Sequence, residues 1–172
     1  MAILSIWVLV LFVSNGCISH QTNVQGIGVR GDVVGTLRMN QPVAIRNDAP
    51  ETGRKRIESS FGNNYYGDFH QYTAACIKTL TMELERQNIQ VSDSARKTLS
   101  LAVVDATQQM NAFNFKAFVT LTVKTGSGLE KQYVGEQTHG NGWGTTPAVE
   151  HALAHCIEQM LSDQDIISYL EN

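Results

Sequence analysis

The chain has 172 residues with a formal net charge of −3, and 42% of its residues are hydrophobic. This length is enough for one domain with its own hydrophobic core. The mildly acidic balance argues against general nucleic-acid binding, for which a basic stripe is expected, and the presence of only three prolines argues against extended disorder.

Residues 1–17 have the pattern of a targeting segment. Residues 2–13 form an almost unbroken apolar run, and a short stretch ending in Gly16 separates this run from Cys17. The run spans about twelve residues, whereas a membrane-spanning helix needs roughly 20, so a signal sequence explains it better than a permanent anchor. The pattern resembles a bacterial lipoprotein signal peptide. That resemblance implies cleavage after Gly16 and attachment of diacylglycerol and a further acyl group, such as palmitate, to Cys17.

The lipoprotein pattern divides the chain into three parts. They are a signal peptide at 1–16, a lipidated N-terminus with a polar tether at 17–26, and a single domain at 27–172. Because Ile18 rather than an aspartate follows Cys17, the resemblance implies an outer-membrane lipoprotein facing the periplasm. Two alternatives stay open, since no basic residue precedes the apolar run. In the first, the chain is a soluble secreted protein. In the second, the apolar run is a short strand or helix in the core of a cytosolic protein.

The first half of the domain contains one predicted core strand and one predicted helix. Residues 43–45 are the best candidate for the strand, and residues 48–67 lack a consistent period and are predicted to be a loop. Asp68 is a good N-cap for a helix that ends near residue 87. Its apolar stripe consists of Phe69, Thr73, Cys76, Ile77, Leu80 and Leu84.

Three strands and a second long helix follow. The strands are predicted at 98–104, 112–124 and 129–136, because apolar and polar residues alternate along them. A hairpin turn at 125–128 joins the last two. Thr146 and Pro147 then predict the start of a helix. Its apolar stripe consists of Val149, Ala152, Leu153, Cys156, Met160 and Leu161.

The order of elements predicts an α+β fold. A capping-box pattern at 162–165 adds a short last helix. Each long helix has one apolar stripe and the sheet has one apolar face. We therefore expect a two-layer sandwich: a mostly antiparallel sheet of about four strands, with both long helices on one face.

Several small Gram-negative envelope lipoproteins resemble this chain in layout. The YajG-like lipoproteins are the most similar, on the basis of the signal with Cys17, the helix near 72–87 and the C-terminal segment 148–172. The layout is also similar to the LPS-assembly lipoprotein of the LptD barrel and to auxiliary lipoproteins of ABC-type transport systems. The resemblance implies a role in maintenance or assembly of the cell envelope.

Two cysteines lie on the apolar stripes of the two long helices. If the helices are neighbours, Cys76 and Cys156 could approach within the roughly 4.4–6.8 Å between Cα atoms that a disulfide requires, and an oxidising compartment would permit the bond. The alternative is that both are small buried hydrophobic residues, as free cysteines commonly are.

A possible binding patch combines residues from the two loops that precede the long helices. Parallel helices would bring these loops to one end of the sandwich, and aromatic and asparagine side chains are common in binding surfaces. A basic run in the same region could meet an anionic lipid or glycan. The patch consists of Tyr65, Tyr66, His139, Asn141, Trp143, Arg54, Lys55 and Arg56. Alternatively, Trp143 covers the edge of the core and the basic run is simply solvated.

The sequence contains no recognisable catalytic motif. His151 and His155 have a helical spacing that can hold a metal, with Glu158 nearby, but a third ligand is not evident. We expect no enzyme activity, cofactor, metal or nucleic-acid partner. The first hypothesis is a non-enzymatic accessory or assembly lipoprotein that binds an envelope protein or polymer. The alternative is a lipid- or glycan-binding module that serves a transport system and has an apolar pocket between helices and sheet.

Overall fold

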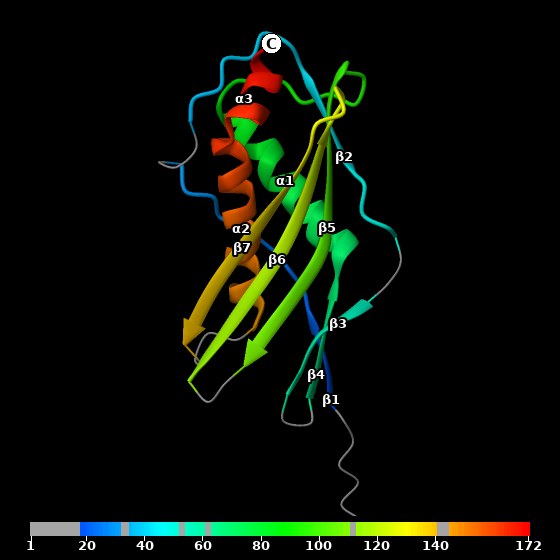
Figure 1. The fold of residues 1–172 in the computed structure, drawn as a ribbon, viewed down its shortest axis with the longest axis vertical. Coiled ribbons are helices and arrows are strands. Elements are labelled where there is room, and N and C mark those ends of the chain that lie inside the picture. Colours follow the sequence, from blue (N-terminus) through cyan, green and yellow to red (C-terminus); the bar gives the residue numbers. More distant parts are fainter. Residues whose placement is uncertain (1–17, 32–34, 52–53, 61–62, 111–112, 141–144) are drawn as a thin grey trace, which may run out of the picture.

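The main sheet of the computed structural model has four strands in the order β2-β5-β6-β7. The structure describes residues 18–31, 35–51, 54–60, 63–110, 113–140 and 145–172 (Figure 1). The strands are β2 (Val43–Asn47), β5 (Lys97–Met110), β6 (Asn114–Thr125) and β7 (Glu130–Gly140). Only the β2–β5 pair is parallel, and the other two pairs are antiparallel.

Two long helices cover one face of this sheet, as the sequence predicts. They are α1 (Phe69–Arg86) and α2 (Thr145–Ser162), and the short helix α3 (Gln164–Glu171) follows α2. Both long helices run upwards in Figure 1, towards the end that holds the C-terminus. The predicted α+β sandwich is therefore confirmed, and the predicted order β-α-β-β-β-α holds for the main sheet and the two long helices. Among the described residues, no helix is long and apolar enough to cross a membrane.

The capping residues explain where two of the helices begin. Asp68 accepts a hydrogen bond from the Gln71 backbone N–H at 3.1 Å, so the predicted N-cap of α1 is confirmed. At α3 the N-cap is Asp163, whose carboxylate accepts from the Asp165 backbone N–H at 2.9 Å. The Ser162 hydroxyl instead donates back to the Glu158 carbonyl, which is why the expected capping box is displaced by one residue.

A second, three-stranded sheet was not predicted. It consists of β1 (Ile18–Thr22), β4 (Asn63–Asp68) and β3 (Arg54–Ser60), in the order β1-β4-β3. The expected loop at 48–67 is therefore wrong. The strands lack a visible period because β3 has one buried apolar residue, Ile57, and its register shifts between Arg56 and Glu58.

The N-terminal segment also differs from the expected tether. Residues 18–22 form β1, which pairs in parallel with β4. The end of β1 is fixed to α1 because the buried Tyr72 hydroxyl donates to the Thr22 carbonyl at 3.0 Å. From its first described residue, the segment is thus part of the folded domain.

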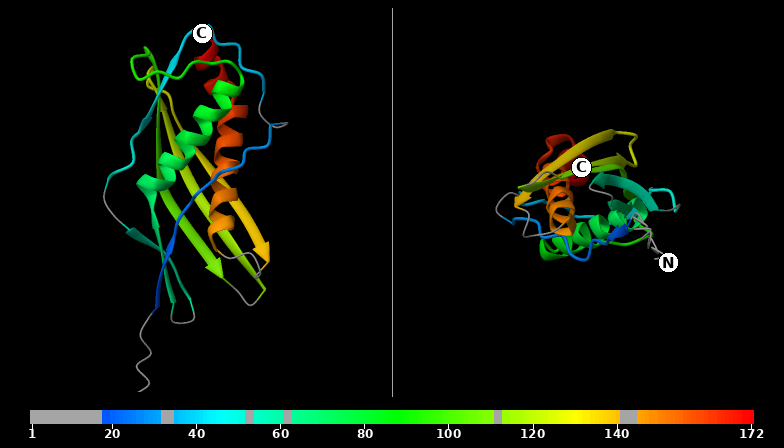
Figure 2. Two further views of the ribbon diagram at one scale, coloured as in Figure 1. Left: turned by 180° about the vertical axis from the view of Figure 1, so that it is seen from behind. Right: turned by 90° about the horizontal axis from the view of Figure 1, so that it is seen from below.

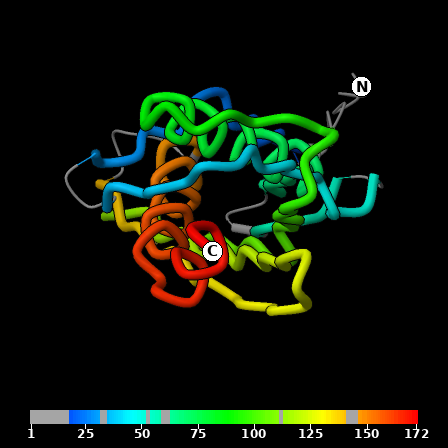
Figure 3. Tube along the Cα trace, turned by 90° about the horizontal axis from the view of Figure 1, so that it is seen from above, coloured from blue at the N-terminus to red at the C-terminus, as the bar shows by residue number. Residues whose placement is uncertain are grey.

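Residues 24–31, here called the strap, cross the side of the helices that faces away from the sheet (Figure 2). Their backbone is held by carboxylates of α2. The N–H groups of Gln25 and Gly26 donate to Glu150 at 2.8 and 3.3 Å, and the Arg30 N–H donates to Glu158 at 2.9 Å. Viewed from the C-terminal end, the main sheet, the helices and the N-terminal segment lie next to one another in that order (Figure 3).

A bulge in β5 determines which side chains reach the core. Leu99, Leu101 and Val103 are buried, but the pairing with β6 shifts between Val103 and Asp105, so the buried positions continue at Ala106 and Gln108. The buried Thr73 hydroxyl of α1 accepts the Val103 N–H at 2.8 Å and donates to the Phe69 carbonyl at 2.8 Å. A helix side chain therefore satisfies the backbone where the strand deviates from regular pairing.

The β7 edge of the main sheet is partly covered by side chains of α2. The carbonyl groups of Val134 and Glu136 on β7 lie 2.9 Å from Gln159 Nε2 and 2.8 Å from His155 Nδ1. An exposed strand edge invites pairing with other chains. These contacts occupy part of that edge and favour a sheet that ends within the molecule.

Candidate functional site

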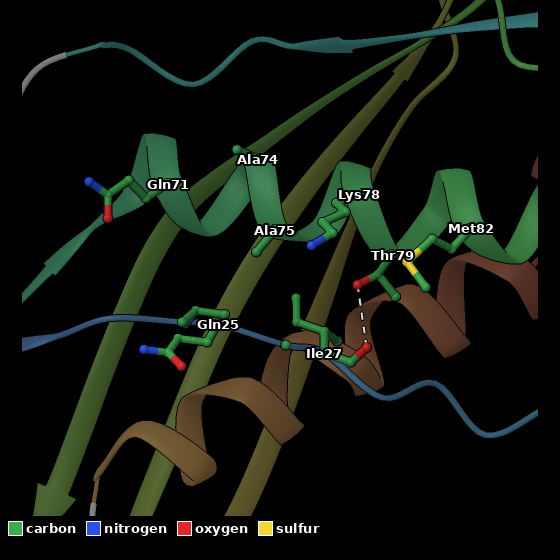
Figure 4. Close-up of a pocket in the computed structure, with 10 residues that line it drawn as sticks. Gln25, Ile27, Gln71, Ala74, Ala75, Lys78, Thr79 and Met82 are labelled. Atoms are coloured by element: carbon green, nitrogen blue, oxygen red, sulfur yellow. Dashed lines mark hydrogen bonds between the residues drawn. The ribbon is translucent and has the colours of Figure 1, made fainter.

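A groove of about 500 Å³ lies between the strap and the outer face of α1. Figure 4 shows α1 forming one wall and the strap forming the other. The volume falls in the range of small-molecule sites, roughly 300–1,000 Å³. Its lining residues are Val24, Gln25, Gly26, Ile27, Gln71, Ala74, Ala75, Lys78, Thr79 and Met82.

Hydrogen bonds hold the two walls of the groove together. The Thr79 hydroxyl donates to the Ile27 carbonyl at 3.4 Å (Figure 4). On the other side of the strap, Gln25 and Gly26 are fixed to Glu150 of α2. The groove is therefore built from backbone that both long helices position.

The side chains on the α1 wall explain why the groove is open and mostly apolar. Ala74 and Ala75 are too small to fill the space beneath the strap, and Met82 is 60% exposed at one end. Lys78 is the charged side chain of the lining, and Figure 4 shows its amine directed towards the strap. Within the described part of the chain, no carboxylate forms an ion pair with Lys78.

Five of the predicted patch residues lie on the small sheet rather than in a loop. The Arg54 guanidinium lies 4.6 Å from the centre of the Tyr66 ring, and the Lys55 amine lies 4.6 Å from the Phe69 ring. Tyr65 stacks on His20 of β1, with 5.0 Å between ring centroids. Exposed Arg56 is paired with Tyr66 in the β3–β4 register. Because side chains alternate along a strand, Arg54, Arg56 and Tyr66 share one face of the small sheet, and Lys55 and Tyr65 lie on the other.

The other patch residues are placed differently. His139 lies near the end of β7, and its Nε2 is 2.9 Å from Nδ1 of His151 on α2. Partial burial, followed by the neighbouring His151, lowers the pKa of His139. This residue therefore joins β7 to α2. Asn141 and Trp143 lie outside the described residues, as does Cys17.

Cys76 and Cys156 are both buried and both free thiols in the structure. Of the two alternatives, the structure has the free, buried cysteines and not the disulfide. The Cys156 thiol lies 3.5 Å from the carbonyl oxygens of Val119 and Tyr133. Burial raises the pKa of Cys156 to about 12 and raises the pKa of Cys76 as well. Since the thiolate is the nucleophile, both environments disfavour a nucleophilic role for these cysteines.

The histidines considered as metal ligands have structural contacts. His155 lies against the backbone of β7, while the Glu158 carboxylate accepts hydrogen bonds from the Arg30 side chain at 3.3 and 3.2 Å. Across the described ranges, no group of three or more histidine, cysteine, aspartate or glutamate side chains could hold a metal ion.

Sequence reasoning missed the groove. Its α1 residues lie outside the apolar stripe, and its other wall comes from a segment that we expected to belong partly to a tether. The available signal was the pair Ala74 and Ala75, small residues on the polar side of a helix. These two small residues indicate a groove only once the strap is known to lie over them.

Comparison with known proteins gives a fold likeness without a family assignment. No protein-family model matches the sequence, and no curated protein matches it either. Among solved structures, the chain is similar to a DUF330-family protein from Xanthomonas campestris at 11% identity, with 88% of this chain and 94% of that chain covered and a TM-score of 0.48. It is also similar to an uncharacterised protein at 12% identity, with 84% and 94% covered and a TM-score of 0.36. At these values the likeness carries no functional argument.

Proposed function

We propose that the protein is a lipoprotein of the cell envelope, anchored through Cys17, that works as a non-enzymatic accessory or binding protein. The observation that carries the proposal is the position of Ile18. This residue directly follows the candidate lipid site and begins β1, at the end of the molecule opposite the C-terminus (Figure 1). A lipid on Cys17 would therefore hold the folded domain close to the bilayer.

Exposed apolar side chains at the same end support this orientation. Ile18 is 61% exposed and Phe113, directly before β6, is 82% exposed. Figures 1 and 2 both place the starts of β1 and β6 at the end away from the C-terminus. Apolar residues at the water–bilayer boundary lose contact with water. This end of the domain is suited to face the membrane to which Cys17 would be attached.

The small sheet is the surface that we assign to a protein or polymer partner. One face of it presents Arg54 and Arg56 beside Tyr66, on strands that fix their spacing, whereas Lys55 and Tyr65 lie on the other face. Arginine and tyrosine are enriched among residues that dominate binding energy at interfaces.

The absence of an aspartate after Cys17 supports an outer-membrane location facing the periplasm.

The proposal is tested by labelling cells with an alkyne analogue of palmitate and fractionating their membranes. The unaltered chain should carry the label and sediment with the outer membrane. Cys17→Ser should lose the label and leave that fraction, whereas Ser19→Ala, a matched change at the exposed start of β1, should behave like the unaltered chain. Equal labelling of the Cys17→Ser chain would refute anchoring through this residue.

Crosslinking tests the assignment of the small sheet. A partner captured from crosslinked envelopes should be lost with Arg54→Ala and Tyr66→Ala, and should be retained with Lys124→Ala on the main sheet. Retention of that partner by the small-sheet variants would refute the assignment.

The groove favours a second candidate function, a ligand-binding module. An apolar hollow of about 500 Å³, with a lysine that no described carboxylate neutralises, fits a lipid better than a glycan, because glycan sites require many hydrogen-bonding groups. This hollow lies outside the helix layer and not between helices and sheet, where the alternative hypothesis placed it.

A further inference from the structure

We propose that the groove between the strap and α1 binds a single-chain amphiphile with an anionic head group, the head lying at Lys78 and the chain extending along Met82. This inference rests on the second candidate function and is independent of lipidation at Cys17.

The direction of the acyl chain follows from the continuity of the hollow. A second hollow of about 200 Å³ shares Ile27, Thr79 and Met82 with the groove and continues to Val29. It ends at the ion pair between Glu83 and Arg86. Ile27 and Val29 are partly buried against the core, and Met82 is mostly exposed. An unbranched chain laid along these residues would remove both its own apolar surface and that of Met82 from water.

The charge of the head group follows from the lining of the groove. Lys78 is the charged residue of this lining. The carboxylates that hold the strap, Glu150 and Glu158, already accept hydrogen bonds from the strap backbone and from Arg30. An anion at the Lys78 amine therefore gains an attractive partner without displacing an existing ion pair. The carboxylate of a fatty acid and the phosphate of a lysophospholipid share this chemistry.

The opposite end of the groove supports one chain rather than two. Gln71 of α1 and Gln25 of the strap lie at that end (Figure 4). Burying their amides against a second acyl chain would cost hydrogen bonds to water. The longer apolar path therefore leads from Lys78 past Thr79 and Met82.

Binding can be measured by calorimetry on the full chain carrying Cys17→Ser, so that no attached lipid competes. The probes are dodecanoate, dodecyl phosphate, dodecanol and dodecyltrimethylammonium, each below its micelle concentration. We expect both anionic probes to bind more tightly than the cationic one. Preference for dodecanoate would indicate a fatty acid as the source of the head group, and preference for dodecyl phosphate would indicate a phospholipid.

Variants then locate the site. Lys78→Gln should weaken both anionic probes about two- to fivefold, the range expected for an exposed charge pair, and should leave dodecanol unchanged. Lys124→Gln, on the outer face of the sheet, is the matched control and should change nothing. Thr79→Trp, which would fill the part that the two hollows share, should abolish binding of every probe. Met82→Trp, at a 60% exposed position, repeats that test if Thr79→Trp fails to fold.

The outcomes separate the inference from the functions on which it builds. Absence of binding by the unaltered groove, equal binding of the cationic probe, or binding that survives both tryptophan variants would overturn it. Co-purification of a lipid or glycan with a chain whose groove is filled would keep the ligand-binding function while rejecting this site.

Discussion

Gly135 of β7 and Ala152 of α2 are in such close contact that the strand has no room for a side chain at this point. A Cβ built on Gly135 would overlap the carbonyl group of Ala152 and would lie 2.9 Å from the Cys156 sulfur. Real Cβ atoms do not approach other atoms this closely. The contact therefore fixes the distance between helix and sheet, and glycine is required for packing rather than for backbone conformation.

Gly135→Ala is expected to be strongly destabilising, because the methyl group meets helix backbone that cannot rotate away. Overpacking typically costs about 1–3 kcal/mol, and occasionally more. Urea unfolding of the variant measures the loss. The control is Gly140→Ala in the same strand, where a Cβ has no atom within 4 Å. Equal stability of the two variants would contradict the tight helix–sheet contact.

Thr73→Val should cost about 1–3 kcal/mol, the penalty for leaving a buried donor without an acceptor. The change keeps the shape of the side chain and removes the hydroxyl that accepts the Val103 N–H at the β5 bulge. Thr73→Ser keeps that hydroxyl and should lose less stability. A Thr73→Val variant that unfolds at the same urea concentration as the unaltered chain would show that this hydrogen bond does not stabilise the bulge.

The same bulge explains why the sequence predicted only part of β5. Alternation of Leu99, Leu101 and Val103 predicted a strand, but the shift after Val103 moves the buried positions to Ala106 and Gln108. A strict period of two ends there, although the strand continues to Met110. The long helices and β6 lack such an interruption, and their periods predicted them well.

The small sheet and the groove could not be predicted for a different physical reason. The strands β3 and β4 bury little apolar surface, so their pattern resembles a loop. The groove depends on the strap lying over Ala74 and Ala75, residues far away in sequence. Periodicity reports which face of an element is buried, whereas it does not report which distant segment crosses the exposed face.

Acidification should release the strap from α2. Burial raises the pKa of Glu158, but the hydrogen bonds and charge of Arg30 outweigh it, so that the pKa lies below its usual value of 4.5. A carboxyl group whose pKa is lower in the folded state stabilises that state above the unfolded pKa. This contribution disappears as the pH falls below about 4.5 and through the folded pKa.

Hydrogen exchange of the Arg30 amide measures this release. Its protection should fall with acidification in the unaltered chain. In Glu158→Gln it should be low at neutral pH and nearly independent of pH. The exposed Glu85→Gln is the control and should keep the original profile. If the Arg30 amide stays equally protected in Glu158→Gln, the Glu158 carboxylate is not the group that holds the strap on α2.

The two buried cysteines should resist alkylation in the folded protein. Iodoacetamide requires an accessible thiolate, while both thiols are fully buried and have raised pKa values. Mass spectrometry should find Cys76 and Cys156 unmodified in buffer and both alkylated in urea without a reductant. Alkylation in urea only after reduction would show that the two cysteines form a disulfide in the native protein.

The central claim is that Cys17 carries a lipid and holds the domain close to a membrane, and the N-terminal peptide of the protein isolated from membranes tests it most directly. Mass spectrometry after proteolysis should find a peptide that begins at Cys17 and carries diacylglycerol and one further acyl chain. A peptide that retains residues 1–16, or a mature chain that begins without lipid on Cys17, would contradict the account.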